Sequence, residues 1–322
     1  MGAGMRNGKA TFSHAAHADG ASHALIDARF FAPPEHLSRY FTTFYRLEVR
    51  LPEGETVSDY LQPEWAGMRF FAQRGPRGQS GTGHRVDGAL VQAGGPTSLP
   101  VPFTLWNTRL WGFGFLPLGW ATFIGTHAAE RANWMGDGFD APDFARHAAL
   151  HGDLFADSPD DEGEFAKIVA HFEDCVSEHP DTKRILAIHH AIMNPDLQTI
   201  GALADEVGMS TRTLERCCAK HFGFSPSVLL RRQRLMRTIA AFMLDDAANW
   251  SAVIDRNYHD QSHFTHEFQH FMAMSPSEYA ALDKPILRAF MAERMRIWGS
   301  PVQTLDPPAR QPAGRQDYDA RA

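Results

Sequence analysis

The chain has 322 residues, 43% of them hydrophobic, and carries a formal net charge of −7 at neutral pH. This length and apolar content allow two domains with buried cores, whereas three cysteines do not suggest a disulfide framework. No stretch reaches the roughly 18 consecutive apolar residues of a membrane-spanning helix, and the N-terminus lacks a basic segment followed by an apolar one. We therefore expect a cytoplasmic protein.

The first half of the chain has the pattern of a β-rich domain. Residues 1–24, rich in Gly, Ala and His, predict a flexible arm. Residues 25–155 follow with short strand patterns that are separated by turns such as Gly75-Pro76. Several short strands at this spacing predict a β-sandwich or barrel. The predicted strands are Phe41–Leu51, Trp65–Gln73, Arg85–Gln92, Val101–Trp106 and Arg109–Phe115.

Aromatic side chains are dense in this region, where they can line an apolar ligand pocket or simply form the core. The strand region offers one histidine, His84, and so lacks the clustered imidazoles of a metal-dependent cupin. The chain also has no Gly-x-Ser-x-Gly elbow, phosphate-binding glycine loop or His-Glu-x-x-His helix. We expect no enzyme, no catalytic residue, no metal and no cofactor. If a pocket exists, its candidate wall residues are Trp65, Arg69, Trp106 and Trp111.

The pattern becomes helical after the last predicted strand. We assign residues 156–193 to connecting helices, residues 194–284 to an all-helical domain, and residues 285–322 to a terminal helix and a disordered tail. The terminal helix is predicted over Asp283–Trp298. The whole chain is thus predicted to have an α+β fold of two domains. The predicted helices before residue 194 are Leu116–Gly125, Ala128–Met135, Asp143–Phe155, Glu162–Glu178 and Thr182–Met193.

A helix-turn-helix pattern follows residue 198. Apolar residues from Ile200 to Val207 recur with the spacing of one helix face, and Gly208 can take the left-handed backbone that ends a helix. Ser210 is a good N-cap for a second helix. Exposed positions near the start of such a helix reach base edges in a major groove, where a bidentate Arg–guanine pair contributes roughly 1–3 kcal/mol of discrimination. These positions are Arg212, Glu215 and Arg216.

Pro226 begins an apolar-striped segment that extends to about Leu244, and proline is tolerated at the first position of a helix. A helix of about nineteen residues spans roughly 28 Å, close to the spacing of about 34 Å between recognition helices in successive major grooves. The segment therefore predicts a rigid linker between two DNA-reading units. Four of its arginines either lie near phosphates or form an ordinary solvated face: Arg231, Arg232, Arg234 and Arg237.

A second helix-turn-helix pattern extends from Trp250 to Phe271. Its second helix carries a stripe of four histidines, a spacing that can suit zinc or nickel. One straight helix cannot close a tetrahedral site around a single ion, so we interpret the stripe as a polar face beside an apolar core. The four residues are His259, His263, His266 and His270.

This combination resembles the AraC/XylS family of bacterial transcription regulators. The matching motifs include Gly208-Met-Ser210, Phe222-Gly-Phe-Ser-Pro226 and Ser275-Pro-Ser-Glu-Tyr279. The resemblance implies two helix-turn-helix units that bind promoter DNA, and a cupin-like N-terminal domain for sensing or dimerisation. It implies a monomer or homodimer, with a small-molecule effector and RNA polymerase as further candidate partners.

Carried over position by position, the resemblance implies three sets of DNA contacts. The base-reading residues of the first unit are Arg212, Glu215 and Arg216. Those of the second unit are Gln261, Ser262, Thr265 and His266. The expected phosphate contacts are Ser210, Arg231, Arg232, Arg234 and His263. Because the second unit has Asn257-Tyr258 in place of the family's Gly-aromatic turn, and a histidine in place of its exposed arginine, we expect the first unit to dominate base reading.

The charge balance argues against strong non-specific DNA binding. Residues 185–284 contain nine Lys/Arg against eleven Asp/Glu, although residues 211–237 hold seven cationic residues and one Glu. This local positive strip predicts modest affinity and a clear salt dependence. Two alternatives stay open at this point: a cupin-like enzyme with a vestigial helical domain, and an interaction protein that does not bind DNA.

Overall fold

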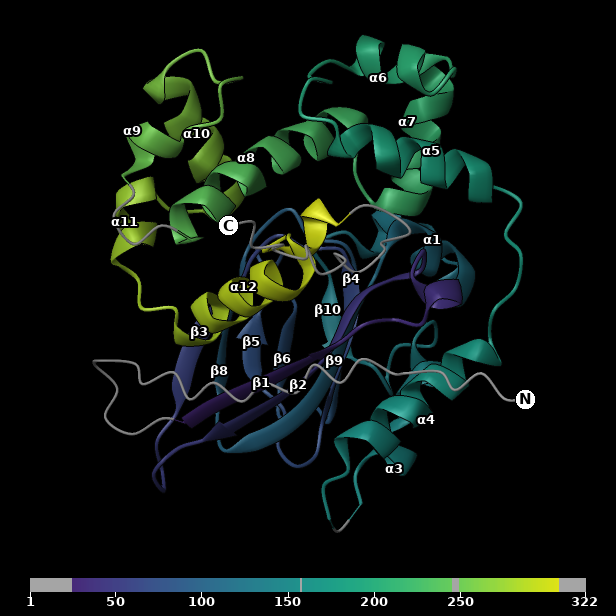
Figure 1. Cartoon of the computed structure of the whole chain (residues 1–322), viewed down its shortest axis with the longest axis vertical. Coiled ribbons are helices and arrows are strands. Elements are labelled where there is room, and N and C mark those ends of the chain that lie inside the picture. Colours follow the sequence, from purple (N-terminus) through teal and green to yellow (C-terminus); the bar gives the residue numbers. More distant parts are fainter. Residues whose placement is uncertain (1–24, 157, 245–248, 307–322) are drawn as a thin grey trace, which may run out of the picture.

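The computed structural model describes residues 25–156, 158–244 and 249–306 (Figure 1). The predicted N-terminal arm and residues 307–322 of the predicted tail lie outside the described residues. Two antiparallel sheets form the lower part of the molecule in Figure 1, and a helical region lies above them. This arrangement confirms the predicted α+β fold, in which a β-sandwich is followed by helices.

The larger sheet has six strands in the order β1-β2-β9-β4-β7-β10, and the smaller has four in the order β3-β8-β5-β6. Tyr45 of β2 pairs with Gly112 of β9, where a Cβ atom would come within 2.3 Å of the tyrosine ring. Glycine therefore lets the Tyr45 ring lie across the neighbouring strand. The strands are β1 (Leu25–Phe31), β2 (Phe41–Arg50), β3 (Val57–Leu61), β4 (Ala66–Phe71), β5 (Arg77–Gln79), β6 (Arg85–Asp87), β7 (Val91–Gly94), β8 (Val101–Leu105), β9 (Thr108–Phe115) and β10 (Met135–Asp137).

Four of the five predicted strands correspond to β2, β4, β8 and β9. The fifth, predicted over Arg85–Gln92, is wrong as a single strand, because Gly88 has a left-handed φ of 79° and divides it into β6 and β7. These two strands then join different sheets. Four strands were not predicted, and two of them, β5 and β10, have three residues each, which is too short for an alternating pattern.

Short helices follow the sheets. The helix predicted over Ala128–Met135 is wrong beyond Arg131. Asn133 there has a positive φ of 55°, and its side-chain oxygen accepts hydrogen bonds from the backbone of Ser98 and Leu99 at 2.8 and 3.2 Å. The chain therefore leaves the helix and enters β10. The helices of this region are α1 (Pro117–Gly119), a π-helical turn (Trp120–Ile124), a 3-10 turn (Ala128–Arg131), α2 (Ala145–Ala148), α3 (His151–Leu154), α4 (Asp161–Glu173) and α5 (Thr182–Met193).

The C-terminal region contains two helix-turn-helix units at opposite ends of one long helix, α8 (Figure 1). This confirms the predicted pair of units and their linker helix, which starts with Pro226 at its first position. No helix within the described ranges is both long and apolar enough to cross a membrane. The helices are α6 (Ile200–Glu206), α7 (Thr211–Phe222), α8 (Pro226–Leu244), α9 (Trp250–Val253), α10 (Gln261–Met272), α11 (Pro276–Ala281) and α12 (Pro285–Trp298).

Buried apolar side chains continue from the sheets into the first helix-turn-helix unit. One cluster includes both Phe113 of β9 and Leu214 of α7. A second cluster, which includes Phe268, lies under the second unit. The terminal helix α12 returns to the sheets, where Phe290 packs edge-on against Phe30 with ring centroids 5.1 Å apart. The chain after the second unit therefore contacts the β-rich domain again.

Candidate nucleic-acid interface and adjoining pocket

Local capping explains where α6 and α7 begin. The Thr199 hydroxyl accepts a hydrogen bond from the Ala202 backbone at 3.1 Å, and the Ser210 hydroxyl accepts one from Thr213 at 3.3 Å. Between the helices, Gly208 has a φ of 62°, the left-handed conformation that the sequence predicted for this turn. The apolar side of α7 is buried, so its polar side faces outward.

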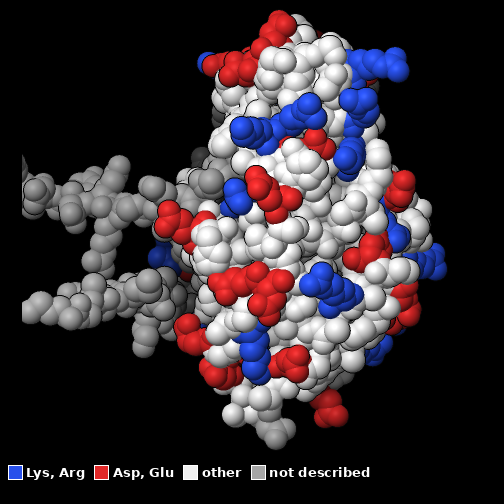
Figure 2. Space-filling model, turned by 90° about the vertical axis from the view of Figure 1, so that its right-hand side faces the viewer, with Lys and Arg blue, Asp and Glu red and all other residues white. Residues whose placement is uncertain are grey.

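The outward face of α7 carries the candidate base-reading residues of the first unit. Arg212, Glu215 and Arg216 are all exposed, as contact with base edges requires. Figure 2 views the side of the molecule that bears α5–α7. Several Lys and Arg side chains lie on the upper part of this face, below Asp and Glu side chains at its top, and the lower part is of mixed charge. The first unit therefore presents an accessible polar face with two arginines.

The second recognition helix, α10, begins with an aspartate cap and buries its phenylalanines. Gln261, Ser262 and His266 are exposed. Thr265 is half-buried, and its hydroxyl donates to the Gln261 carbonyl at 2.8 Å. Three of the four candidate base-reading side chains of this unit are thus accessible, and the fourth is partly engaged within its own helix.

The predicted phosphate contacts divide into accessible and buried residues. Ser210 is exposed, whereas Arg231 and His263 are half-buried. Arg232 and Arg234 are wrong as phosphate contacts, because they are 0% and 8% exposed and face the protein interior. The positive strip predicted along the linker helix is therefore weaker than the sequence suggested.

Arg232 instead attaches α8 to the β-rich domain. Its Nη1 donates to the Thr97 carbonyl at 2.8 Å, and its guanidinium lies 4.2 Å from the centroid of the Trp65 ring. Burial lowers the pKa of Arg232 to about 9. The sequence contains a signal for this position, because Arg232 lies three residues after Leu229 and four before Met236, on the buried stripe of α8.

A buried cluster around Glu267 joins α8 to α10. The Glu267 carboxylate accepts hydrogen bonds from Arg231 at 2.8 Å, from Arg234 at 2.7 Å and from the Tyr258 hydroxyl at 2.7 Å. Burial raises the pKa of Glu267, but these hydrogen bonds outweigh it and leave the pKa below its usual value. The cluster sets the orientation of the second recognition helix relative to the linker. Sequence reasoning missed it, because Glu267 lies 33 and 36 residues from its arginine partners.

Asn257, which departs from the family pattern, and the nearby Asp255 have structural roles in the second unit. Arg237 of α8 donates to the Asp255 carboxylate at 2.9 Å, and the Asn257 backbone donates to it at 2.9 Å. The Asp255 backbone in turn donates to the Thr238 hydroxyl at 3.1 Å. The altered turn is therefore attached to the linker helix by polar contacts.

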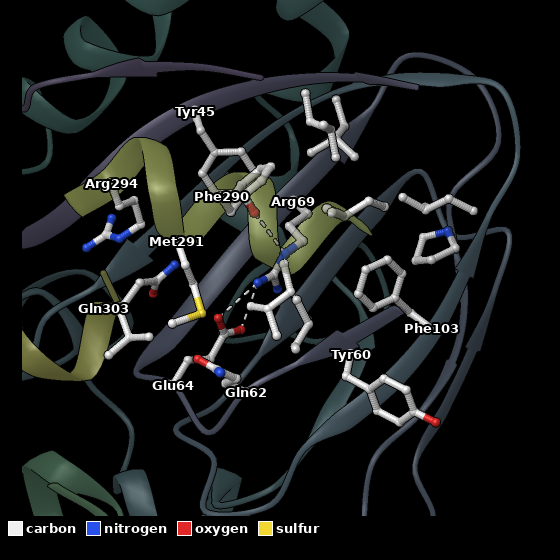
Figure 3. A pocket seen from close by; sticks show the side chains of 18 of the residues that line it. Tyr45, Tyr60, Gln62, Glu64, Arg69, Phe103, Phe290, Met291, Arg294 and Gln303 are labelled. Carbon is white, nitrogen blue, oxygen red and sulfur yellow. Dashed lines mark hydrogen bonds and ion pairs between the residues drawn. The ribbon is translucent and has the colours of Figure 1, made fainter. Parts of the chain in front are cut away.

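A pocket lies between the two sheets and α12 (Figure 3), with about 830 Å³ of space free of protein atoms, part of which is open solvent. Apolar side chains from five strands and α12 form most of its wall. At its polar centre, Arg69 donates to Glu64 at 2.8 Å and to the Tyr45 hydroxyl at 2.9 Å. The side-chain oxygens of Gln62 and Gln303 are buried without a hydrogen-bond partner among the described residues. Such oxygens can accept from a donor group of a bound molecule.

Of the four predicted pocket residues, Arg69 lines this pocket and the three tryptophans do not. Trp65 is buried beneath Arg232. Trp111 is buried in the core and donates its indole N–H to a carboxylate at 2.6 Å. Trp106 lies under the Arg74 guanidinium, whose Cζ is 3.7 Å from the centroid of the Trp106 ring. The contribution of α12 was missed, because a helix far away in sequence leaves no signal on the strands that it covers.

A carboxylate from β3 caps α12 at the edge of the pocket. Asp59, which is 1% exposed, accepts backbone hydrogen bonds from Ile286 at 2.7 Å and from Leu287 at 2.8 Å. Burial raises the pKa of Asp59 to about 6, against the lowering effect of these hydrogen bonds. Near the other end of α12, Arg294 pairs with Asp306 at 2.6 Å. Both ends of α12 are thus held by buried polar contacts.

Comparison with known proteins identifies one domain of the chain. A family model described as a helix-turn-helix domain matches residues 203–281. No curated protein matches the chain.

Among solved structures, the chain is similar to ToxT from Vibrio cholerae, with 11% identity, a TM-score of 0.41, and coverage of 80% of this chain and 97% of ToxT. A structure of ToxT from strain SCE256 with bound unsaturated fatty acid has 10% identity, a TM-score of 0.38, and coverage of 80% and 95%. The AraC-like transcriptional activator CuxR has 12% identity, a TM-score of 0.29, and coverage of 68% and 83%. The match over residues 203–281 and the two capped helices α7 and α10 identify this part of the chain as a helix-turn-helix domain.

Proposed function

We propose that one chain places α7 and α10 in two successive major grooves on the same face of B-DNA. The observation that carries this proposal is the position of the two recognition helices at opposite ends of α8, each with an exposed polar face. The 19 residues of α8 span about 28 Å at ~1.5 Å per residue. Offsets at the two ends can supply the remainder of the roughly 34 Å that separates successive grooves.

We assign base reading mainly to the first unit. Arg212 and Arg216 are exposed, and each can donate two hydrogen bonds to a guanine, which contributes roughly 1–3 kcal/mol of discrimination. Glu215 can accept from the amino group of a cytosine. In the second unit Gln261 suits adenine, whereas His266 offers no bidentate fork. The second unit therefore fixes the position of the protein on DNA and the spacing of the two boxes, and it contributes less to base discrimination.

The electrostatic contribution to DNA binding is small in this proposal. Residues 211–237 contain seven cationic residues, but Arg232 and Arg234 are buried. Arg231 and Arg237 pair with Glu267 and Asp255, so three cationic residues remain exposed toward DNA. Lys220 also pairs with Asp181 at 3.2 Å. Each phosphate contact contributes about −0.9 to the slope of log K against log salt. We therefore expect a slope no steeper than roughly −3.

We also propose that the pocket binds an uncharged, mainly apolar effector that carries a hydrogen-bond donor. Arg69 and Arg294 each pair with a carboxylate, so they do not hold an unbalanced charge for an anion. The oxygens of Gln62 and Gln303 suit a donor group instead. Because α12 forms one wall, an effector that prefers one position of α12 changes how the second unit is presented to DNA.

This function assigns residues 25–155 to sensing, residues 156–193 to connection and residues 194–284 to DNA binding. The protein would act in the cytoplasm on promoter DNA, beside RNA polymerase, and would have no enzymatic activity. One chain is sufficient for two half-sites, so a monomer or a homodimer can perform it.

Selection of bound fragments from a random DNA pool tests the DNA-binding proposal. We expect a motif of two boxes about one helical turn, roughly 10.5 base pairs, apart, with guanines in the box that α7 reads. A single box would contradict the use of two grooves. If no fragment is bound even at low salt, an interaction protein that does not bind DNA becomes the better interpretation.

Pocket-filling variants test the effector proposal. Leu287→Trp places a large ring in the pocket wall, whereas Met295→Trp changes the outer side of the same helix, where Met295 is 43% exposed. An uncharged apolar compound that raises the unfolding temperature of the wild type should still do so in Met295→Trp and should fail in Leu287→Trp. Equal responses in both variants would show that the compound binds elsewhere.

A further inference from the structure

A cluster of three potential metal ligands lies on the helical side of the β-rich domain, near α4 at the lower right of Figure 1. It comprises His147 of α2, His171 of α4 and Cys175 in the turn after α4. A nitrogen of each histidine and the thiol sulfur lie within 4.8 Å of one another. His147 is buried, whereas His171 and Cys175 are half-buried, so an ion can reach the cluster from solvent.

Hydrogen bonding sets the tautomer of His147. Its Nε2 lies 2.9 Å from the Phe123 carbonyl, which can only accept, so Nε2 carries the proton and Nδ1 carries the lone pair. This lone pair faces Nε2 of His171, 2.9 Å away. A carbonyl on the far ring nitrogen is the arrangement that orients metal-bound histidines. The Phe172 ring also stacks on His147, with centroids 5.1 Å apart, and restrains the imidazole.

We propose that His147, His171 and Cys175 bind a divalent transition-metal ion, for which Zn²⁺ is the best match. Two imidazole nitrogens and a thiolate sulfur form a ligand set for borderline-soft ions, and three protein ligands leave one tetrahedral position for water. Nitrogens bound at about 2.0–2.1 Å to a tetrahedral ion lie about 3.3 Å apart. The two imidazoles are thus near this spacing already, and rotation of the Cys175 side chain completes the site.

Binding of the ion releases one proton in total. The Cys175 thiol loses its proton to solvent, and the proton of His171 moves from Nε2 to Nδ1, so that both facing nitrogens offer lone pairs. Burial lowers the pKa of His147 to about 4 and also lowers that of His171, which keeps both rings neutral at pH 7. Burial raises the pKa of the Cys175 thiol, so affinity should increase with pH. The charged groups that act on the cluster are Arg146, Asp153 and Asp174.

The proposed site lies at the start of the segment that connects α4 to α5, and the far end of this segment contacts the first recognition helix, α7. Cys175 ends the turn after α4, and Asp181 lies at the end of this segment, before α5. The Asp181 carboxylate contacts Lys220 at 3.2 Å and His221 at 3.1 Å, both in α7. A bound ion would therefore stabilise the segment that positions the first reading unit.

Cobalt spectroscopy on the full chain tests this proposal. The protein is dialysed against a chelator and titrated with Co²⁺ alone. We expect one equivalent to bind with the near-ultraviolet band of a cobalt–thiolate bond and the visible bands of tetrahedral cobalt, and Zn²⁺ to abolish both. The thiolate band should be lost in Cys175→Ser. In His171→Gln the apparent affinity for Co²⁺ should decrease at least tenfold. All of the bands should remain in Cys217→Ser, which removes a thiol elsewhere, in α7.

The outcomes separate this site from adventitious binding. Cobalt bands without the thiolate contribution would overturn the proposal and would point to the histidines of α10 instead. A thiolate band that survives Cys175→Ser would also overturn it. Unfolding temperatures provide the check on folding. Metal-free Cys175→Ser and wild type should unfold at the same temperature, and only the increase on adding Zn²⁺ should be lost in the variant. A wild type that Zn²⁺ does not stabilise would also contradict the site.

Discussion

Replacing Asp59 with alanine should loosen α12 from the β-rich domain and leave the rest of the fold in place. The Asp59 carboxylate accepts the backbone hydrogen bonds of Ile286 and Leu287 at 2.7 and 2.8 Å, and its side chain is 1% exposed. Loss of an N-cap costs about 0.5–2 kcal/mol, and each buried donor without an acceptor costs about 1–3 kcal/mol. Water can reach these amides once α12 shifts, which limits the penalty. We therefore expect the variant to lose about 2–4 kcal/mol of the free energy that holds α12 against the sheets.

Hydrogen exchange of the full chain measures this effect helix by helix. A loss of about 2–4 kcal/mol corresponds to roughly 30- to 700-fold faster exchange in α12, while α8 should keep its protection. Asp59→Asn is the matched control, because asparagine is an equally good cap and retains an acceptor oxygen. Unchanged protection of α12 in the alanine variant, or equal loss in both variants, would refute the role of Asp59 as its cap.

Changes in the helical region test DNA reading and packing separately. Replacing both Arg212 and Arg216 with alanine should remove preference for the selected motif, by about 1–3 kcal/mol per guanine contact, with little change in binding to random DNA. If titrations show an equal loss of affinity for the selected motif and for random DNA, the two arginines contact phosphates only. Glu267→Ala should lower the free energy of unfolding in urea by about 3–5 kcal/mol, because a buried arginine loses its partner; exposed Glu215→Ala is its near-neutral control. Burial lowers the pKa of His189 to about 3. Above pH 6.5 this histidine is neutral in both the folded and the unfolded chain and costs no stability. As the pH falls from 6.5 towards 3 only the unfolded chain binds the proton, so the free energy of unfolding decreases by up to about 5 kcal/mol. His189→Gln should flatten the decrease in unfolding temperature over this range, and an unchanged slope would contradict the assignment.

Local signals were sufficient for much of the helical region. The helices Thr182–Met193 and Pro226–Leu244 begin and end where the sequence predicts. Their boundaries follow from apolar periodicity and, for the second, from proline at the first position. The turn at Gly208 was predictable for the same reason, since a glycine after an apolar stripe marks a left-handed helix end.

Contacts between distant segments were not predictable in this way. Arg234 looks solvated in the sequence, but Glu267, which lies 33 residues further along the chain, supplies the polar partner that allows its burial. For Arg232 the sequence shows a position on the buried stripe of α8, but it does not show that Thr97 is its partner. The base-reading candidates of α7 were easier to predict, because their exposure follows from the helix period alone. The pocket was mostly missed, since its wall depends on where the predicted terminal helix packs. An amphipathic pattern indicates a helix with a buried face, but it does not say which surface covers that face.

The two reading units are attached to the β-rich domain in different ways, and this difference determines which unit an effector can move. The first unit shares a core cluster with the sheets, and Arg232 attaches the start of α8 to Thr97. The core cluster of the second unit consists of residues from 228 onward. Its contacts with the sheets pass through α12 and through Gln62, a pocket residue whose amide donates to the Tyr279 hydroxyl of α11 at 3.0 Å.

An effector in the pocket should therefore act on the second unit and leave the first in place. We expect it to change the preferred spacing between the two DNA boxes, because α10 would shift relative to α7. Binding to DNA that contains only the first box should not respond to the effector. Titrations on duplexes with one box, and with two boxes at several spacings, check this. An equal change in affinity on all of them would mean that the effector alters both units together, and the difference in attachment would have no regulatory role.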